Sequence, residues 1–244
     1  ACGLASAQTQ PPATVQTVRG DVRLRQAAGG AAQPAVPGDA LAIDDLLTTD
    51  FDSEATLSLP GGSRVKLREM SQVRINNLFL SDDQALAALA QSVGRALRQH
   101  GVMLATAESC TGGWVAQVVT GVAGSSEWFE RGLIAYSNTA KRELLGVSTD
   151  VLVRQGAVSE ATARAMAEGA CARSHAQVSM AVTGIAGPSG GSPEKPVGTV
   201  CFAWSGRKRT TLSLTERFSG DRDAVRRQAV ARALQGLLEF LESH

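Results

Sequence analysis

Two glycine-containing segments carry the residue types that suit nucleophilic chemistry. The first is Glu108-Ser-Cys-Thr-Gly-Gly113, which follows an apolar stretch and precedes a helical pattern. Its two glycines let the backbone approach a ligand closely, and the start of the helix offers unpaired N–H groups. The Ser109 hydroxyl on such a turn suits a nucleophile beside an oxyanion hole. The alternative is that Ser109 and Thr111 only cap the helix.

The second segment is Thr183-Gly-Ile-Ala-Gly-Pro-Ser-Gly-Gly191, which follows the apolar residues 178–182. A glycine-rich loop after a buried strand is typical of a site for a phosphate or another anion. Glycine loops are also common connectors, so this signal is weak by itself. Lys195 and Arg222 are cations that would support an anion here, or they are ordinary surface charges.

A serine nucleophile needs a base, and the sequence favours a lysine. The three histidines lie outside both glycine loops, which disfavours a Ser-His-Asp arrangement (His100, His175 and His244). Lys141 follows Tyr136 by five residues, where a strand is expected to lead into a helix. Burial lowers the pKa of a lysine enough for it to act as a base. Tyr136, the only tyrosine, either assists it or is a half-buried core aromatic.

Cys110 competes with Ser109 for the role of nucleophile. A thiolate at a helix N-terminus is stabilised by the nearby N–H groups. The residues by themselves leave the choice between Ser109 and Cys110 open.

Composition narrows the class of protein. The 244 residues are 43% hydrophobic and 19% charged, which predicts a packed, soluble protein. Lys plus Arg number 24 against 23 for Asp plus Glu, a balance that argues against a nucleic-acid binder. No apolar run reaches the roughly 18 residues of a membrane span. The four cysteines are scattered and no zinc-ligand spacing occurs, so no metal cofactor is expected.

The elements that must position these loops begin at Ser81, where Ser81-Asp-Asp-Gln84 fits a capping box. Helical and strand-like patterns then alternate, which predicts an α/β domain over 81–244. We expect three α/β/α layers with a mostly parallel sheet and an antiparallel edge. Both glycine loops would lie beyond the carboxyl ends of strands, where such sheets bind ligands. The predicted helices are 81–101, 112–120, 139–145, 159–174 and 221–241, and the predicted strands 102–107, 133–136, 178–182, 197–204 and 210–218.

Residues 14–78 follow a different pattern, with short alternating runs between Gly, Pro and Asp turns, which predicts a small all-β domain. Pro60-Gly-Gly-Ser63 predicts a hairpin turn. The Asp and Arg positions of this half are expected to form turns and solvated faces. Residues 1–13 are expected to be a disordered tail or the remnant of a secretory signal, because Ala5-Ser-Ala7 resembles a cleavage site.

Each half resembles a known family. The β half resembles the periplasmic FecR-type domain of bacterial cell-envelope proteins, through Val18-Arg-Gly-Asp-Val22, Pro37-Gly-Asp39 and Leu59-Pro-Gly-Gly-Ser63. The second half resembles the nicotinamide-nucleotide amidase family, also known as the CinA C-terminal domain. That resemblance is carried by Ala107-Glu-Ser-Cys-Thr-Gly-Gly113, Tyr136-Ser-Asn138, Lys141, Gly156-Ala-Val-Ser159, Thr183-Gly-Ile-Ala-Gly-Pro188, Lys195-Pro-Val-Gly198 and Phe218-Ser-Gly-Asp-Arg222.

The second resemblance implies hydrolysis of nicotinamide mononucleotide to nicotinate mononucleotide and ammonia, without a metal cofactor and often in a homo-oligomer. It implies Ser109 as nucleophile, Lys141 as base, Tyr136 assisting and Thr183 close to the reacting amide. Gly112 and Gly113 would supply oxyanion donors, Gly184 and Gly187 would line the nucleotide, and Arg222 would hold it. Glu108 and Thr111 would also contact substrate.

The two resemblances imply different compartments. Pyridine-nucleotide salvage implies the cytoplasm, which we expect for the active form, whereas a FecR-type domain implies the periplasm. The alternative function is a non-catalytic nucleotide sensor attached to an envelope-signalling β domain. The partner of the β half is not specified by any motif.

Overall fold

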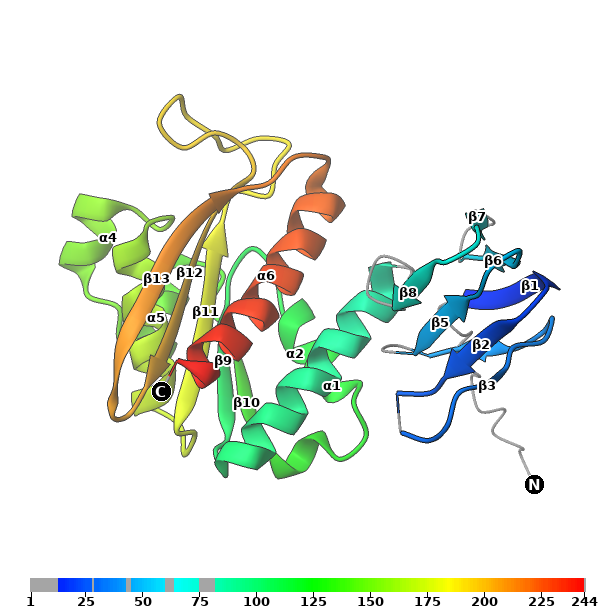
Figure 1. Ribbon diagram of the computed structural model, residues 1–244. Coiled ribbons are helices and arrows are strands. Elements are labelled where there is room, and N and C mark those ends of the chain that lie inside the picture. The colour runs from blue at the N-terminus through cyan, green and yellow to red at the C-terminus, as the bar shows by residue number, and fades with distance from the viewer. Residues whose placement is uncertain (1–12, 28, 43–44, 60–63, 75–81, 244) are drawn as a thin grey trace, which may run out of the picture. The chain divides into compact units, whose positions relative to one another are not determined.

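The computed structural model describes residues 13–27, 29–42, 45–59, 64–74 and 82–243 (Figure 1). The chain divides into two compact units, residues 1–85 and 86–244. Residues 1–12 of the expected tail 1–13, the turn at 60–63 and the cap at Ser81 lie outside the described residues, and Ala13, the last residue of that tail, is instead buried at the start of a strand. None of the described helices is long and apolar enough to cross a membrane.

The first unit is built from two four-stranded antiparallel sheets, ordered β4-β1-β6-β7 and β3-β2-β5-β8. Alternate side chains of the strands point inward, so that Leu47 and Leu57, one from each sheet, are fully buried in one shared core. This confirms the all-β prediction for the described part of the first half. The strands are β1 (Ala13–Arg19), β2 (Val22–Arg25), β3 (Gln33–Pro34), β4 (Ala40–Leu41), β5 (Leu46–Thr49), β6 (Glu54–Ser58), β7 (Arg64–Leu67) and β8 (Gln72–Arg74).

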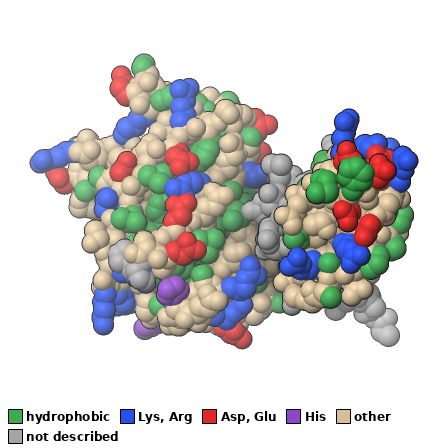
Figure 2. All heavy atoms as spheres, in the orientation of Figure 1, with side chains coloured by type: hydrophobic (Ala, Val, Ile, Leu, Met, Phe, Trp, Pro, Cys, Tyr) green, Lys and Arg blue, Asp and Glu red, His purple; other side chains and the backbone are tan. Residues whose placement is uncertain are grey.

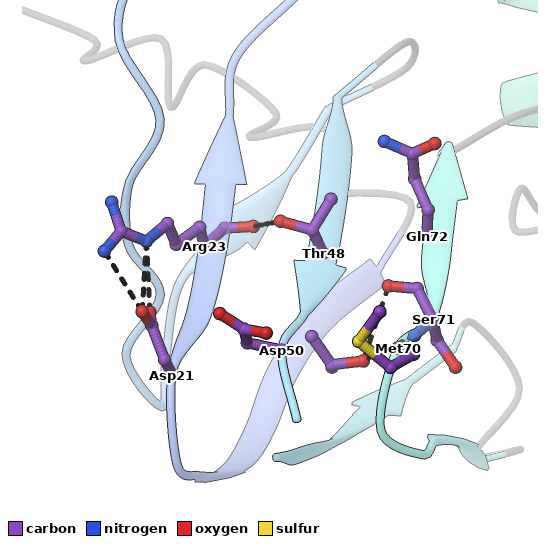
Figure 3. A pocket seen from close by; sticks show the side chains of 8 residues that line it. Asp21, Arg23, Thr48, Asp50, Met70, Ser71 and Gln72 are labelled. Carbon is purple, nitrogen blue, oxygen red and sulfur yellow. Dashed lines mark hydrogen bonds and ion pairs between the residues drawn. The ribbon is translucent and has the colours of Figure 1, made fainter. Parts of the chain in front are cut away.

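A shallow hollow lies beside β2, β5 and β8 of this unit (Figure 3). Asp21 and Arg23 at its edge form an ion pair at 3.0 Å, and both side chains are about half exposed. Such exposed pairs contribute little to stability. These two positions therefore form a solvated face, as the sequence predicts.

The second unit contains one five-stranded sheet, ordered β10-β9-β11-β12-β13. Strands β10, β9 and β11 are mutually parallel, and β12 and β13 form an antiparallel hairpin at the other edge. The elements are α1 (Asp82–His100), β9 (Leu104–Glu108), α2 (Trp114–Thr120), η3 (Ser125–Glu127), β10 (Phe129–Ile134), α3 (Asn138–Leu145), α4 (Thr149–Gln155), α5 (Glu160–Ala172), β11 (Val178–Gly184), β12 (Thr199–Gly206), β13 (Arg209–Arg217) and α6 (Arg222–Glu242).

The α/β prediction is confirmed, but the sheet, which was expected to be mostly parallel, is mixed because β12 and β13 form an antiparallel hairpin, and two elements also differ in detail. Helix α4 was not expected, because seven residues are too few to display a helical period. Strand β10 begins at Phe129 rather than at Leu133, because an edge strand keeps polar residues that hide the strand pattern. The sheet is mixed, with equal numbers of parallel and antiparallel pairs.

Helices cover both faces of this sheet and complete three layers (Figure 1). Large side chains such as Met180, Val182 and Phe202 pack with α1, α2 and α6. The intervening strand residues are small, among them Ala107 and Ala181, and they pack with α3, α4 and α5. This strict alternation lets α5 approach the sheet closely. Acidic and basic side chains are interspersed over the face shown in Figure 2, as the balanced charge predicts.

The parallel pairing fixes where the loops lie. Glu108 of β9 is opposite Val182 of β11 and Ile134 of β10, so all three strands end together. The segments after them therefore meet at one edge of the sheet. This is the edge at which open α/β sheets bind ligands.

Substitution of Gly169 tests the close packing of α5 against the end of α3. A Cβ at this position of α5 would overlap the carbonyl oxygen of Leu145, the last residue of α3. We expect Gly169→Ala to lower the free energy of unfolding by about 1–3 kcal/mol, because a backbone carbonyl cannot give way as a side chain can. Urea unfolding followed by tryptophan fluorescence measures this unit alone, since all three tryptophans lie in it.

The matched control is Glu168→Ala, an exposed position on the same helix. Its effect should stay within about 0.5 kcal/mol, as for most surface substitutions. An unchanged unfolding midpoint for Gly169→Ala would contradict the packing described here.

Candidate functional site

Ser109 lies at the turn that follows β9, at the shared end of the parallel strands. Its N–H donates to the carbonyl of Val182 on β11 (2.9 Å), and its own carbonyl accepts from the N–H of Gly112 (3.0 Å). The side chain is 8% exposed. The hydroxyl is therefore held on a tight turn with little freedom of position.

Lys141 of α3 reaches the same point from the other side. Helix α3 starts at the cap of Ser137, whose hydroxyl accepts from the N–H of Ala140 (3.0 Å). The side chain of Lys141 is 1% exposed. Its Nζ lies 2.9 Å from Ser109 Oγ, 2.9 Å from the carbonyl oxygen of Ala135 and 3.3 Å from that of Tyr136. The two residues that the sequence singled out as nucleophile and base are thus in direct contact.

The environment of Lys141 suits a base. Burial lowers the pKa of Lys141 below that of an ordinary lysine, because the charged form loses its hydration, and the nearby Cys110 opposes this shift only in part. A neutral amine has two N–H donors and one lone pair. In the neutral form, the carbonyls of Ala135 and Tyr136 would take the two donors and leave the lone pair to accept the hydroxyl proton of Ser109.

Cys110 has the opposite environment. Its side chain is 6% exposed, and burial raises the pKa of the thiol to about 12. The thiol therefore stays protonated at neutral pH despite its place before a helix. A protonated thiol is a poor nucleophile, so the geometry favours Ser109.

Glu108 holds the loop from within. One carboxylate oxygen accepts from the N–H groups of Gly113 (3.0 Å) and Val115 (3.1 Å), and the other accepts from that of Ala116 (2.8 Å). The side chain is 1% exposed. The sequence placed Glu108 among the substrate contacts, whereas here both oxygens bind the start of α2. A carboxylate is well suited to this place, because a helix N-terminus attracts negative charge.

The expected oxyanion donors are already occupied. The N–H of Gly112 donates to Ser109 and that of Gly113 to Glu108, so neither is available to a substrate. These glycines serve the turn instead, since their φ angles of 61° and 95° are left-handed. In the part of the chain that is described, the N–H groups of Cys110 and Thr111 donate to no oxygen. They are the donors that the loop has to offer.

Thr111 is fully buried in the same loop. Its hydroxyl has no hydrogen-bond partner among the described residues. The loop therefore holds an unsatisfied side-chain hydroxyl as well as two unused N–H groups.

Thr183 is near the end of β11, and the second glycine loop follows this strand, next to the serine loop. The Thr183 hydroxyl donates to the carbonyl of Ala157 (2.8 Å), and its side chain is buried. A Cβ at Gly184 would meet the backbone of Thr199, and one at Gly187 would meet the side chain of Val197. Gly184 is thus required by close packing of β11 against β12, and Gly187 by close packing within the loop.

Arg222 connects this loop to Tyr136. Its guanidinium donates to the carbonyl of Gly187 (2.7 Å) and to the hydroxyl of Tyr136 (3.3 Å). Tyr136 is 62% exposed, so it is not a core residue. Lys195 does not join this pair. Its Nζ donates to the carbonyls of Gln155 (2.9 Å) and Val158 (2.7 Å) and so connects the end of α4 to the second glycine loop.

Arg226 was not among the site residues predicted from the sequence. This side chain of α6 donates from Nε to the carbonyl of Cys110 (3.1 Å) and from Nη2 to that of Thr111 (2.9 Å). It lies four residues after Arg222, on the same face of the helix. That spacing is the signal by which it could have been found.

Comparison with known proteins supports one family. The family model for the CinA C-terminal domain matches residues 86–241. The nicotinamide-nucleotide amidohydrolase PncC of Escherichia coli strain K12 is 52% identical over 162 residues, which cover 66% of this chain and 98% of that protein. The enzyme of the same name from Pseudomonas putida is 49% identical over 155 residues, 64% of this chain and 96% of the relative.

Solved structures of CinA-type proteins are also similar to this chain. The competence/damage inducible protein CihA from Agrobacterium tumefaciens has a TM-score of 0.63 and 44% identity, and the match covers 66% of this chain and 96% of that one. A CinA superfamily protein from Klebsiella pneumoniae has a TM-score of 0.63 and 38% identity, over 65% and 99% of the two chains. The chain therefore belongs to the CinA C-terminal domain family.

Proposed function

We propose that the α/β unit hydrolyses the carboxamide of nicotinamide mononucleotide and releases nicotinate mononucleotide and ammonia. The observation that carries the proposal is the contact of 2.9 Å between Ser109 Oγ and the buried Nζ of Lys141. The relatives named for this activity support the choice of substrate, since they match almost their whole length to this unit.

The reaction begins with proton transfer to Lys141. The neutral amine takes the hydroxyl proton of Ser109 while Oγ forms a bond to the amide carbon. The ammonium of Lys141 then gives its proton to the leaving nitrogen, the C–N bond breaks and ammonia departs. A water molecule attacks the remaining ester with Lys141 again as base, and the proton finally returns to Ser109.

The negative charge that develops on the substrate oxygen needs donors. We assign this role to the N–H groups of Cys110 and Thr111 in place of Gly112 and Gly113, because the latter two are bonded within the loop. Preorganised backbone donors of this kind contribute strongly to acyl-transfer catalysis. Glu108 is then a positioning residue, which fixes the start of α2 behind the nucleophile.

The rest of the nucleotide would lie along the second loop. Arg222 and the exposed Tyr136 form a pair next to Gly187. A guanidinium is well suited to hold the phosphate, and the ring of Tyr136 offers a surface for the pyridine. Thr183 and Gly184 lie at the end of β11, beside Ser109.

The proposed reaction belongs to pyridine-nucleotide salvage, for which we expect the cytoplasm.

Substitution of the nucleophile tests the proposal. We expect Ser109→Ala to lower turnover roughly 10⁴-fold or more, because an acyl-enzyme can no longer form. Cys110→Ala should stay close to wild type, since the buried thiol takes no part. Release of ammonia and of nicotinate mononucleotide from nicotinamide mononucleotide, without added metal, measures both variants.

The same assay separates the alternatives. Full activity in Ser109→Ala together with its loss in Cys110→Ala would make Cys110 the nucleophile. A wild-type protein that binds nicotinamide mononucleotide without releasing ammonia would be the sensor that the sequence allows.

The pH dependence of kcat/KM tests the base. Because only the neutral form of Lys141 accepts the serine proton, kcat/KM should rise with pH and level off above the pKa of Lys141. Burial lowers that pKa, so the midpoint should lie below the ordinary lysine value of about 10.4. Lys141→Arg should lose both the activity and this limb, since arginine stays protonated. A rate that falls with pH over this range would contradict the assignment.

A further inference from the structure

Arg226 binds residues 108–113, the nucleophile loop, through two backbone carbonyls. Its Nε and Nη2 donate to two successive carbonyls, those of Cys110 (3.1 Å) and Thr111 (2.9 Å). Parallel bonds from one planar guanidinium fix orientation as well as position. The contact joins residues 116 and 115 positions apart in the chain. The loop is therefore tied to α6 through its backbone and not through its side chains.

The first of these bonds sets the direction of an oxyanion donor. The carbonyl of Cys110 and the N–H of Thr111 belong to the same peptide unit, which is planar and trans. In a trans peptide the C=O and N–H point in opposite directions. When Arg226 draws the Cys110 carbonyl toward α6, the N–H of Thr111 must point away from α6.

The second bond, from Arg226 to the Thr111 carbonyl, constrains the N–H of Cys110 indirectly. The carbonyl of Thr111 shares its peptide unit with the N–H of Gly112, which donates to Ser109 (3.0 Å). The carbonyl of Ser109 in turn shares its unit with the N–H of Cys110. Arg226 therefore constrains both unused N–H groups, one directly and one through the bond between Gly112 and Ser109.

Arg226 is itself held in place. Its guanidinium lies over the ring of Trp114, 5.1 Å from the centroid. Gly112 lies beside it, and a Cβ there would be in ordinary contact with Nη2 at 3.7 Å. Among the described residues no carboxylate forms an ion pair with Arg226, so its positive charge stays available to the loop.

We infer that Arg226 is the positioning residue of the oxyanion hole: it orients the N–H groups of Cys110 and Thr111 toward the substrate oxygen without touching the substrate. This inference rests on the proposed amidase function. It assigns Arg226 to transition-state stabilisation, whereas Arg222 of the same helix would bind the ground state of the nucleotide.

The test compares Arg226→Gln with a matched control, Arg227→Gln. Arg227 also lies over the Trp114 ring (5.0 Å) and is the next residue of α6, so its loss removes the same charge and the same kind of ring contact. We expect Arg226→Gln to lower kcat for nicotinamide mononucleotide about 100-fold, the loss seen when one oxyanion donor is removed. KM should change less than about threefold, because oxyanion donors act in the transition state. Arg227→Gln should keep wild-type kcat.

Two further readouts separate positioning from a general structural role. The midpoint of the rise of kcat/KM with pH should be the same in Arg226→Gln and wild type, because the contacts of Lys141 are untouched. Arg226→Lys keeps the charge beside Trp114 and so preserves the fold. A lysine binds one carbonyl at a time, so this variant should recover part of kcat and remain about tenfold below wild type.

The outcomes are distinct. Wild-type kcat in Arg226→Lys and Arg226→Gln would overturn the positioning role and leave the amidase function standing. A raised KM with unchanged kcat would make Arg226 a substrate-binding residue, and a moved limb would mean that it acts through Lys141; each overturns the inference. Absence of ammonia release from the wild-type protein would overturn the proposed function, and the role of Arg226 with it.

Discussion

The burial of one lysine amine against one serine hydroxyl is the constraint on which the site depends. A charged amine in this position loses its hydration, and the protein compensates with only three oxygen atoms, two of them backbone carbonyls. The neutral form fits the same three atoms without that cost. Burial therefore lowers the pKa of Lys141, toward the protonation state that a base requires. It can do so only because β9, β10 and α3 bring Ser109, Ala135 and Lys141 to one point.

The nucleophile loop is organised by two opposite charges that bind opposite backbone groups. Glu108 accepts from N–H groups at the start of α2, and Arg226 donates to the carbonyls just before it. Glu108 thus satisfies N–H groups at the helix start, and Arg226 binds the Cys110 carbonyl and adds a second bond to the Thr111 carbonyl, which also accepts from the N–H of Trp114 (3.2 Å). The N–H groups of Cys110 and Thr111 lie between these two anchors and, among the described residues, donate to no oxygen. A loop held from both sides needs no reorganisation when charge develops on a substrate, which is the physical basis of preorganised catalysis.

The two faces of the α/β sheet serve different purposes. The face toward α1, α2 and α6 carries the large apolar side chains and supplies most of the hydrophobic burial. The face toward α5 is lined by alanines, so that α5 packs close and fixes the end of α3 through Gly169. Close packing at these small residues therefore helps to position α3, the helix that carries Lys141. The β unit has its own core, and its resemblance to FecR-type domains stays a prediction.

The sequence by itself determined the order of most elements, though not α4, and the chemical types of the site. Periodicity gave the α/β order, because side chains on strands and helices repeat with different periods. The serine turn, the lysine and the second glycine loop could be identified because each is a local pattern. Only the tertiary structure decided the direction of the Glu108 side chain and which N–H groups of the loop stay unused. It also decided the contact of Arg226, which spans more than a hundred residues. These depend on side-chain direction and strand pairing, which residues close in sequence do not encode, because a carboxylate or guanidinium acts on whatever the fold brings within hydrogen-bond reach.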